Sequence, residues 1–334
     1  MKAPSIDELT GLVDAELAGF LAQRRASLDE AVPMIDEIAR LLQAGGKRLR
    51  PAFCFWGYRA AGGRDTACAL KAASSLELLH TFAIVHDDIM DSSDERRGLP
   101  TTFAEHGVNV ALLVGDLALV LADHAFLRSG FSPEALTRAF DCYSRMRQEV
   151  IAGQYLDVAI SDETRVSVEE ARRIAVLKSG RYSIEEPLLI GASLAGAKEK
   201  LMDGLARFGA PLGEAFQLRD DLLGTFGDRS RTGKPVDSDI REGKRHVLYA
   251  KTIELLGDDA ADFVERWGGG PDLSEAAVEE LRDVIDRSGA RAATEGLLED
   301  LRAEAMEALA ELDIDAESRG VLGELARRAT ERKV

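Results

Sequence analysis

A long stretch without helix breakers is the feature that most constrains the fold. Residues 66–91 contain neither proline nor glycine, and their apolar side chains recur at helical spacing. Residues 275–312 also read as an amphipathic helix, interrupted near Ser288 and Gly289. Only nine prolines occur among 334 residues, and alternating strand patterns are hard to find. These patterns predict an all-α protein with roughly ten or more helices of ordinary length.

Composition narrows the class of protein. Hydrophobic residues make up 46% of the chain, which is enough for a large core and argues against wholesale disorder. The formal net charge of −17 argues against binding of nucleic acid, because such binding needs an excess of Lys and Arg. The charge is uneven, since residues 257–334 hold 21 acidic and 10 basic side chains while residues 1–256 carry a net of only −6.

Cysteine usage and apolar patterning predict a cytoplasmic protein. The three cysteines lie far apart, which is typical of a reducing compartment. The first residues lack the basic and then apolar pattern of a signal peptide. No apolar run approaches the ~18 residues of a membrane helix, so we expect no membrane span. No linker separates two halves, and we predict one domain over residues 1–334, with residues 224–244 as a mobile loop near the candidate active site.

Three aspartates end the first long helix. Asp87 and Asp91 are four residues apart and share one helical face, with Asp88 turned by about 100°. Three carboxylates so close repel one another unless a divalent cation is present, and oxygen ligands suit Mg²⁺. A solvated helix end is the plainer reading of this motif alone.

A second apolar helix, residues 213–223, delivers another aspartate pair. Asp220 and Asp221 are followed at the next equivalent position by Gly224, so a third acid is missing there. Asp228 would share the face of Asp221 if the helix continued, but Gly224 and Gly227 make that continuation doubtful. Two such helix ends in one chain favour a shared metal site.

Basic side chains accompany both aspartate clusters. Carboxylates for a metal combined with Lys and Arg are the composition of a diphosphate site. A P-loop is absent, because Pro235 stands where its hydroxyl residue would be. The five histidines form no ligand pair, which argues against zinc. The candidate basic residues are Lys47, Arg50, Arg96, Arg97, Lys178, Lys234 and Lys244.

Taken together, these motifs resemble the trans-isoprenyl diphosphate synthases, or polyprenyl synthetases, and most of all the short-chain geranylgeranyl diphosphate synthases. The resemblance implies a helical bundle around a central cavity, a homodimer, and three Mg²⁺ per active site. It implies transfer of an allylic group to isopentenyl diphosphate. The motifs, in family order, are GGKRLRP (45–51), ELLHTFAIVHDDIMD (77–91), RRGLPT (96–101), GD (115–116), GQYLD (153–157), KSGRYS (178–183), GEAFQLRDDLLG (213–224) and GKPVDSDIREGK (233–244).

The resemblance also assigns roles to residues. The candidate metal set is Asp87, Asp88, Asp91 and Asp220, in which Asp87, Asp91 and Asp220 are the direct ligands and Asp88 and Asp221 support them. Arg96, Lys178, Lys234 and Lys244 would hold the allylic diphosphate. Lys47, Arg50, His80 and Arg97 match the isopentenyl diphosphate site, while Ser179 and Gln217 line the allylic pocket. Released pyrophosphate would take the proton, so no side-chain base is needed.

Product length depends on the helix before the first motif. Phe82 and Ala83 lie about one turn below Asp87, where a bulky side chain limits chain growth in the family. One aromatic beside an alanine predicts C20 geranylgeranyl diphosphate, with C15 farnesyl diphosphate as the alternative. Plain core packing would also explain Phe82.

Other functions remain open on the sequence alone. A class I terpene cyclase would not need the motif at residues 45–51, and it would need a different second metal motif. A non-catalytic regulatory subunit of a heteromeric synthase would lose aspartates, whereas the first motif is complete here. An acidic helical binding protein would leave the motif order unexplained.

Overall fold

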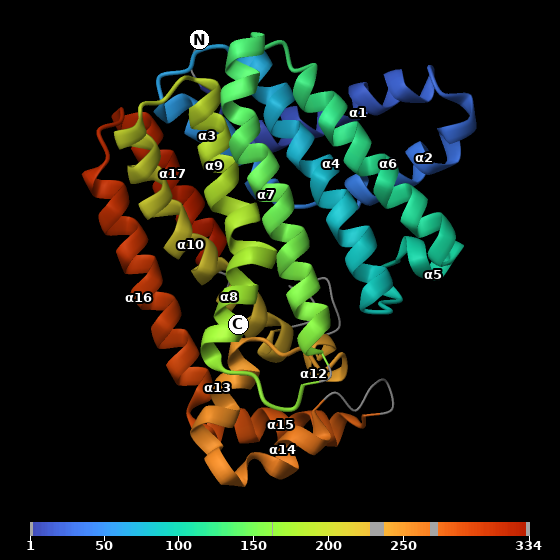
Figure 1. Cartoon of the computed structure of the whole chain (residues 1–334), viewed down its shortest axis with the longest axis vertical. Helices are drawn as coiled ribbons and strands as arrows, with labels where there is room; N and C mark the ends of the chain where they lie inside the picture. Colours follow the sequence, from blue (N-terminus) through green and yellow to red (C-terminus); the bar gives the residue numbers. More distant parts are fainter. Residues whose placement is uncertain (1–2, 162, 228–236, 268–272, 332–334) are drawn as a thin grey trace. The chain divides into compact units, whose positions relative to one another are not determined.

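Helices dominate the structure, as the sequence predicts. The computed structural model describes residues 3–161, 163–227, 237–267 and 273–331 (Figure 1). Two compact units can be distinguished in it. The first contains Met1–Arg145, Glu186–Ala206 and Leu309–Leu325, and the second contains Met146–Glu185, Arg207–Ala308 and Ala326–Val334. The all-α prediction is confirmed, and the single domain over residues 1–334 stays a prediction.

The first unit contains the first aspartate motif. Its elements are α1 (Ile6–Arg25), η1 (Asp29–Ala31), α2 (Val32–Gln43), α3 (Leu49–Ala60), α4 (Thr66–Met90), the short strands β1 (Glu95–Arg96) and β2 (Leu99–Pro100), α5 (Thr102–His106), α6 (Val108–Leu127), the first part of α7 (Pro133–Ile160) and α9 (Glu186–Leu194). In Figure 1, α4 and α6 run side by side, and they pack closely.

The long helix α4 is the central element of this unit. Asp65 caps its start, since its side chain accepts a hydrogen bond from the amide of Cys68 at 3.0 Å. The helix then runs unbroken to Met90, with Asp91 as its C-cap, which confirms the helix predicted for residues 66–91. Most of its length is buried, so α4 carries the aspartates on a rigid support.

The prediction that no segment approaches membrane length was wrong. Helices α4 and α6 are both long and apolar enough to span a membrane by length and composition. A core helix of a soluble protein meets the same criteria, and 61% of the apolar window in α4 is buried within the protein. The apolar side chains of α4 therefore serve the core, whereas α6 keeps a partly exposed apolar face.

The second unit contains the second aspartate motif. Its elements are the remainder of α7, α8 (Val168–Ala175), the π-helix η2 (Val176–Glu185), most of α10 (Glu199–Phe226), α12 (Ser238–Arg241), α13 (Val247–Leu256), η3 (Gly257–Ala260), α14 (Ala261–Arg266), α15 (Glu275–Ser288) and most of α16 (Ala290–Glu311). The last helix, α17 (Ala316–Thr330), contributes residues to both units. The predicted break near Ser288 is confirmed, because α15 ends there and Gly289 adopts a φ of 83°.

The core of the second unit holds the end of α10 in place. Leu218 and Leu222 of α10 are fully buried in one cluster with Tyr249 of α13. Tyr249 lies against Phe263 and Trp267, with ring centroids 5.8 and 5.3 Å away. This packing lets α10 continue through Gly224 to Phe226, so the predicted loop at residues 224–244 begins later than expected and contains the short helix α12. Residues 228–236 of that loop lie outside the described residues.

Candidate active site

Asp87, Asp88 and Asp91 lie at the end of α4 and face a basic side chain from the neighbouring hairpin. Asp88 is only 2% exposed. The guanidinium of Arg96, on β1, donates to Oδ1 of Asp88 at 2.6 Å and lies 3.4 Å from Oδ2 of Asp87. Burial alone would lower the pKa of Arg96, but Asp88, Asp87 and Asp91 raise it. Arg96 is therefore firmly positive, and it partly neutralises the first aspartate motif.

The hairpin that carries Arg96 turns tightly at its next two residues. Glu95 pairs with Pro100 and Arg96 with Leu99. Arg97 and Gly98 form the turn with φ values of 54° and 75°, the left-handed region that two-residue hairpin turns require. Arg97 donates from its guanidinium to the backbone carbonyl of Gly45. The turn thus brings the second arginine of the RRG motif to the GGKRLRP segment.

A cluster of positive charge surrounds His80. The side chain is partly buried, and burial lowers its pKa well below the usual value, with further lowering from Arg50, Arg97, Arg96 and Arg48. The pKa of Arg97 is also lowered by burial and by the neighbouring arginines, although Glu77 opposes this. His80 is thus neutral near pH 7 and surrounded by cations, an environment that favours a bound anion.

Arg48, within the same motif, has a structural task. It is 5% exposed and pairs with Asp14 at 2.8 Å and with Glu77 at 2.7 Å. Its guanidinium also donates to the carbonyl of Leu42 at 2.6 Å. Arg48 therefore holds the loop in place, whereas Lys47 beside it is exposed and Arg50 is half-buried.

Asp220 and Asp221 differ in their surroundings, although they are neighbours on α10. Asp220 is exposed and Asp221 is only 4% exposed. Gln217 donates to Oδ1 of Asp221 at 2.7 Å, while Oδ2 is buried and has no hydrogen-bond partner within the described part of the chain. Burial raises the pKa of Asp221 well above its usual value, and Asp239 and Asp220 add to this against Gln217 and Lys244. This excess of buried acid suits a cation.

Asp239 lies in the GKPVDSDIREGK motif, but the sequence reasoning gave it no role of its own. It lies on α12, is 8% exposed, and has Oδ1 3.9 Å from Nζ of Lys244. A Cβ added to Gly224 would lie only 2.6 Å from Cγ of Asp239 and closer still to Oδ2. The carboxylate of Asp239 thus occupies the space beside the position where the second motif lacks its third acid. The glycine itself was the signal, because it leaves room for a neighbouring side chain.

Lys178 lies on the π-helix η2 and is held by a carboxylate. Its Nζ lies 2.6 Å from Oδ2 of Asp157, the last residue of the GQYLD motif on α7. Both side chains are about one quarter exposed, so the pair is partly shielded from water. Ser179, next on η2, is half-buried. Asp157 was part of a recognised motif, but its role could not be inferred without this contact.

The described residues therefore form two groups, each within its own unit. The first contains Asp87, Asp88, Asp91, Arg96, Arg97, Arg50 and His80, and the second contains Asp220, Asp221, Gln217, Lys244 and Asp239 with the Lys178–Asp157 pair. Lys234 and Asp228 lie outside the described residues.

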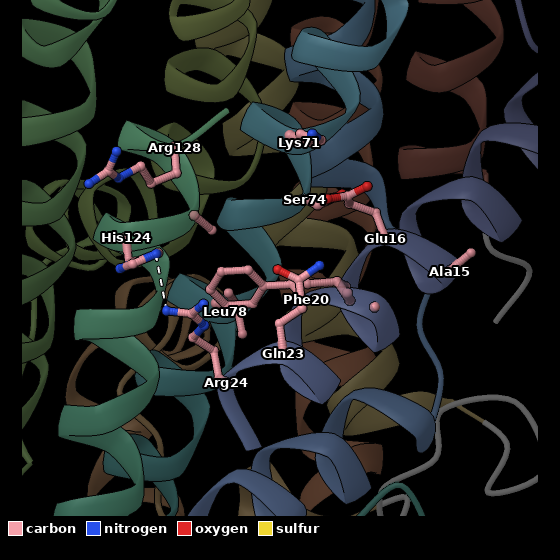
Figure 2. Close-up of a pocket in the computed structure, with 13 residues that line it drawn as sticks. Ala15, Glu16, Phe20, Gln23, Arg24, Lys71, Ser74, Leu78, His124 and Arg128 are labelled. Carbon is pink, nitrogen blue, oxygen red and sulfur yellow. Dashed lines mark hydrogen bonds between the residues drawn. The ribbon is translucent and has the colours of Figure 1, made fainter. Parts of the chain in front are cut away.

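A cavity of about 300 Å³ lies on the other half of α4 (Figure 2). It is lined by α1, α4 and α6, and it contains none of the predicted site residues. Ser74 in its wall lies 13 residues before Asp87, which is about 20 Å along the helix. This cavity is therefore separate from the aspartate motif.

Comparison with known proteins identifies the family of the chain. Residues 32–285 match the polyprenyl synthetase family model. The chain is 36% identical over 264 residues to geranylgeranyl diphosphate synthase of Sulfolobus acidocaldarius, covering 77% of this chain and 78% of that enzyme. It is 36% identical over 250 residues to (2E,6E)-farnesyl diphosphate synthase of Mycobacterium bovis, covering 74% and 68%. The structure of geranylgeranyl pyrophosphate synthase from Corynebacterium glutamicum, complexed with isoprenyl diphosphate and magnesium, aligns with a TM-score of 0.94 at 36% identity, covering 99% of this chain and all of that one.

Proposed function

Because this chain belongs to the polyprenyl synthetase family and is a short-chain trans-prenyltransferase, we propose that it makes C20 geranylgeranyl diphosphate. It would do so by condensing isopentenyl diphosphate with an allylic diphosphate. The observation that carries the prenyl-transfer part of this proposal is that a carboxylate-rich helix end lies beside Arg96, which belongs to the cationic cluster around His80. Carboxylates suit the metal that the family uses, and the cations suit a diphosphate.

The aspartates fit Mg²⁺. We propose Asp87, Asp91 and Asp220 as its ligands, with Asp88 and Asp221 in support and three ions per active site. Asp88 is already engaged by Arg96, which agrees with a supporting role. The buried acid around Asp221 gains stability when a cation is near. Mg²⁺, when bound, neutralises charge on the diphosphate and makes it a better leaving group.

The basic side chains would stabilise the departing diphosphate. Breaking the allylic C–O bond places negative charge on the leaving oxygen, and positioned cations stabilise that charge as it grows. Arg96, Lys178 and Lys244 are the described candidates, and Lys234 completes the proposed set. Asp157 would orient Lys178 through their 2.6 Å contact. The pyrophosphate released in this step would accept the proton lost on product formation.

The other diphosphate would bind at Lys47, Arg50, His80 and Arg97. The cluster is already positive, so an arriving diphosphate replaces repulsion among like charges with attraction. Neutral His80 can donate one hydrogen bond to such a ligand. Ser179 and Gln217 would line the allylic side.

Product length rests on Phe82. Its ring is buried and meets the ring of His86 edge-on, with centroids 4.9 Å apart and planes at 68°. The Nε2 of His86 lies 3.2 Å from the carbonyl oxygen of Leu112 on α6, so His86 links the ring of Phe82 to α6. Phe82, held by His86 and with only Ala83 beside it, favours a C20 product. A C15 product is the alternative, because this chain is 36% identical both to a geranylgeranyl and to a farnesyl diphosphate synthase.

We further propose that the protein is a homodimer and that it acts in the cytoplasm. We expect it not to bind nucleic acid. One side of helix α6 packs on α4. The same helix also exposes several large apolar side chains. A second copy of the chain would cover them and remove apolar surface from water. The exposed side chains are Val108, Val110, Leu112, Leu113, Val120 and Leu127.

One incubation tests the reaction. Purified protein with Mg²⁺ and isopentenyl diphosphate is supplied in turn with C5, C10 and C15 allylic diphosphates, and the products are separated by chromatography. We expect a C20 product that depends on Mg²⁺. An absence of turnover with all three primers would refute the proposed activity, and a terminal C15 product would favour the alternative.

A further inference from the structure

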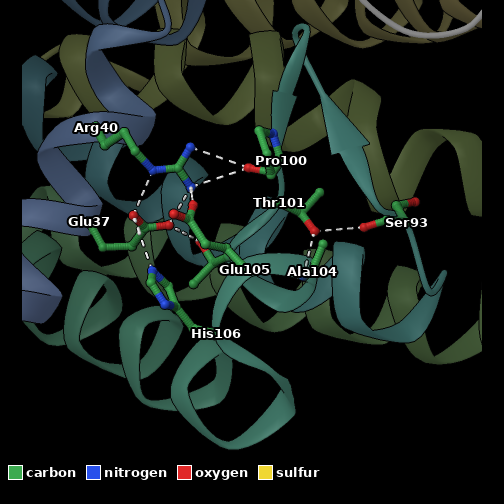
Figure 3. Close-up of polar contacts among 9 residues, drawn as sticks. Glu37, Arg40, Ser93, Pro100, Thr101, Ala104, Glu105 and His106 are labelled. Atoms are coloured by element: carbon green, nitrogen blue, oxygen red, sulfur yellow. Dashed lines mark hydrogen bonds and ion pairs between the residues drawn. The ribbon is translucent and has the colours of Figure 1, made fainter.

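A buried carboxylate lies behind the hairpin that carries Arg96 and Arg97. Glu37 of α2 is 7% exposed, and Arg40 of the same helix donates to its two oxygens at 2.7 and 2.5 Å (Figure 3). Thr102, the first residue of α5, donates its hydroxyl to Glu37 Oε1 at 2.6 Å. Burial alone would raise the pKa of Glu37, but the bonds from Arg40 and Thr102 lower it. Glu37 is therefore an anion that fixes the guanidinium of Arg40.

The guanidinium of Arg40 also contacts the hairpin, at the end away from the turn, which we call its foot. Both terminal nitrogens of Arg40 lie 3.2 Å from the backbone oxygen of Pro100, the last residue of β2 (Figure 3). Two donors on one carbonyl hold Pro100 more firmly than a single bond. A further bond from Thr101 Oγ1 to the carbonyl of Ser93, at 2.7 Å, closes the base of the hairpin.

The same helix leads directly into the GGKRLRP segment. Helix α2 ends at Gln43 with Ala44 as its C-cap, and Gly45 follows. Gly45 accepts the hydrogen bond from Arg97 at the tip of the hairpin. The hairpin is thus tied to α2 and its extension at two points, at the foot through Arg40 and at the tip through Gly45. Two separated contacts define an orientation, whereas one would allow the hairpin to pivot.

We propose that Glu37, Arg40 and Thr102 form a clamp that positions Arg97 against Gly45 and Gly46, next to Lys47 in the sequence, for binding isopentenyl diphosphate. We assign them a positioning role, because their contacts are with one another and with the hairpin. The inference rests on the proposed function, which gives Arg97 and Lys47 to that substrate.

A metal site is the obvious alternative for this corner. Carboxylate oxygens of Glu37 and Glu105 and a ring nitrogen of His106 lie within 4.8 Å of one another. However, Arg40 already contacts both oxygens of Glu37 and lies 3.6 Å from Glu105. The guanidinium supplies the positive charge that an ion would otherwise bring, which supports the clamp.

The test compares steady-state kinetics of Arg40→Met with those of wild type. We expect the KM for isopentenyl diphosphate to rise about tenfold, because a small displacement of a binding group is costly, while the KM for the allylic substrate changes much less. The matched control is Arg25→Met, which removes a pair with Asp36 that links α1 to α2 but is 56% and 52% exposed. Such an exposed pair contributes little, so the control should keep the wild-type KM.

A double variant separates positioning from general destabilisation. If Arg40 acts through Arg97, then Arg40→Met adds less than about threefold to the KM of Arg97→Gln, because the two effects are coupled. Fully multiplying effects, or a lower melting temperature with an unchanged KM, would refute the clamp. If Arg40→Met does not fold, Thr102→Val is the second variant, because it removes only one hydrogen bond to Glu37. We expect its KM for isopentenyl diphosphate to rise about threefold. An unchanged KM in this variant would refute the clamp equally. Wild type without turnover would instead refute the proposed function, and binding of isopentenyl diphosphate measured by calorimetry would then decide on the clamp.

Discussion

The replacement Gly224→Ala tests whether Asp239 takes the place of the missing third acid. The new Cβ would lie 2.6 Å from Cγ of Asp239, whereas ordinary contacts begin at about 3.4 Å. The carboxylate must therefore move by about 1 Å or more, because Oδ2 is closer to the new Cβ than Cγ is. Overpacking of this kind costs about 1–3 kcal/mol of stability. A misplacement of ~1 Å at a reacting site can lower the rate about 100-fold. We therefore expect kcat to fall by about 10- to 100-fold, and we expect a higher Mg²⁺ concentration to be needed for half-maximal activity.

The assay measures kcat against Mg²⁺ concentration, together with the melting temperature. Gly296→Ala is the matched control, because it lies in α16 of the same unit and an added Cβ meets nothing within 4 Å. It should keep full activity and gain about 0.4–1 kcal/mol of stability. The double variant Gly224→Ala with Asp239→Ala should regain the lost stability but stay as inactive as Asp239→Ala. Wild-type kcat and Mg²⁺ dependence in Gly224→Ala would refute the role of Asp239.

Three further predictions follow from the same contacts. Phe82→Ala should shift the product beyond C20, and an unchanged chromatogram would show that Phe82 is not the floor. Asp220→Ala should abolish turnover while Asp228→Ala should not, and equal losses would give Asp228 the role of the missing acid. The carboxylate of Glu37 has a lowered folded-state pKa, so its stabilising effect is complete above the unfolded value of 4.5 and is lost as the pH falls through the folded one. The difference in melting temperature between wild type and Glu37→Gln should therefore shrink from pH 7 to pH 3.5, and a constant difference would contradict this reasoning.

Local sequence patterns predicted the helices in which backbone preference and burial pattern agree. Helix α4 occupies Thr66–Met90 against a predicted 66–91, because its sequence has no breaker and Asp65 caps its start. Likewise Gly289 ends α15 where the pattern was interrupted. In both cases the backbone preference and the burial pattern favour the same structure, so the sequence alone is sufficient.

Tertiary packing determined elements whose bounds the local pattern did not predict. Helix α10 begins at Glu199, well before the predicted residue 213, and continues past Pro211 and Gly224. Local propensity counts both residues as breakers, but it cannot register that Leu218 and Leu222 are fully buried in a core with α13. The hairpin at Glu95–Pro100 was missed for a similar reason, since its two short strands leave no alternating pattern to recognise.

The candidate site shows the same division at the level of single side chains. Charged residues in dense motifs, such as Asp87 and Arg96, were found from spacing because they must approach the same ligand. Asp157 and Glu37 act on other residues of the protein, and only a folded chain brings them to Lys178 and Thr102. A residue that contacts a ligand is constrained by the chemistry of the ligand, which recurs as a motif. A residue that positions another is constrained by local geometry, and several different side chains can satisfy that geometry, so a motif alone does not reveal it.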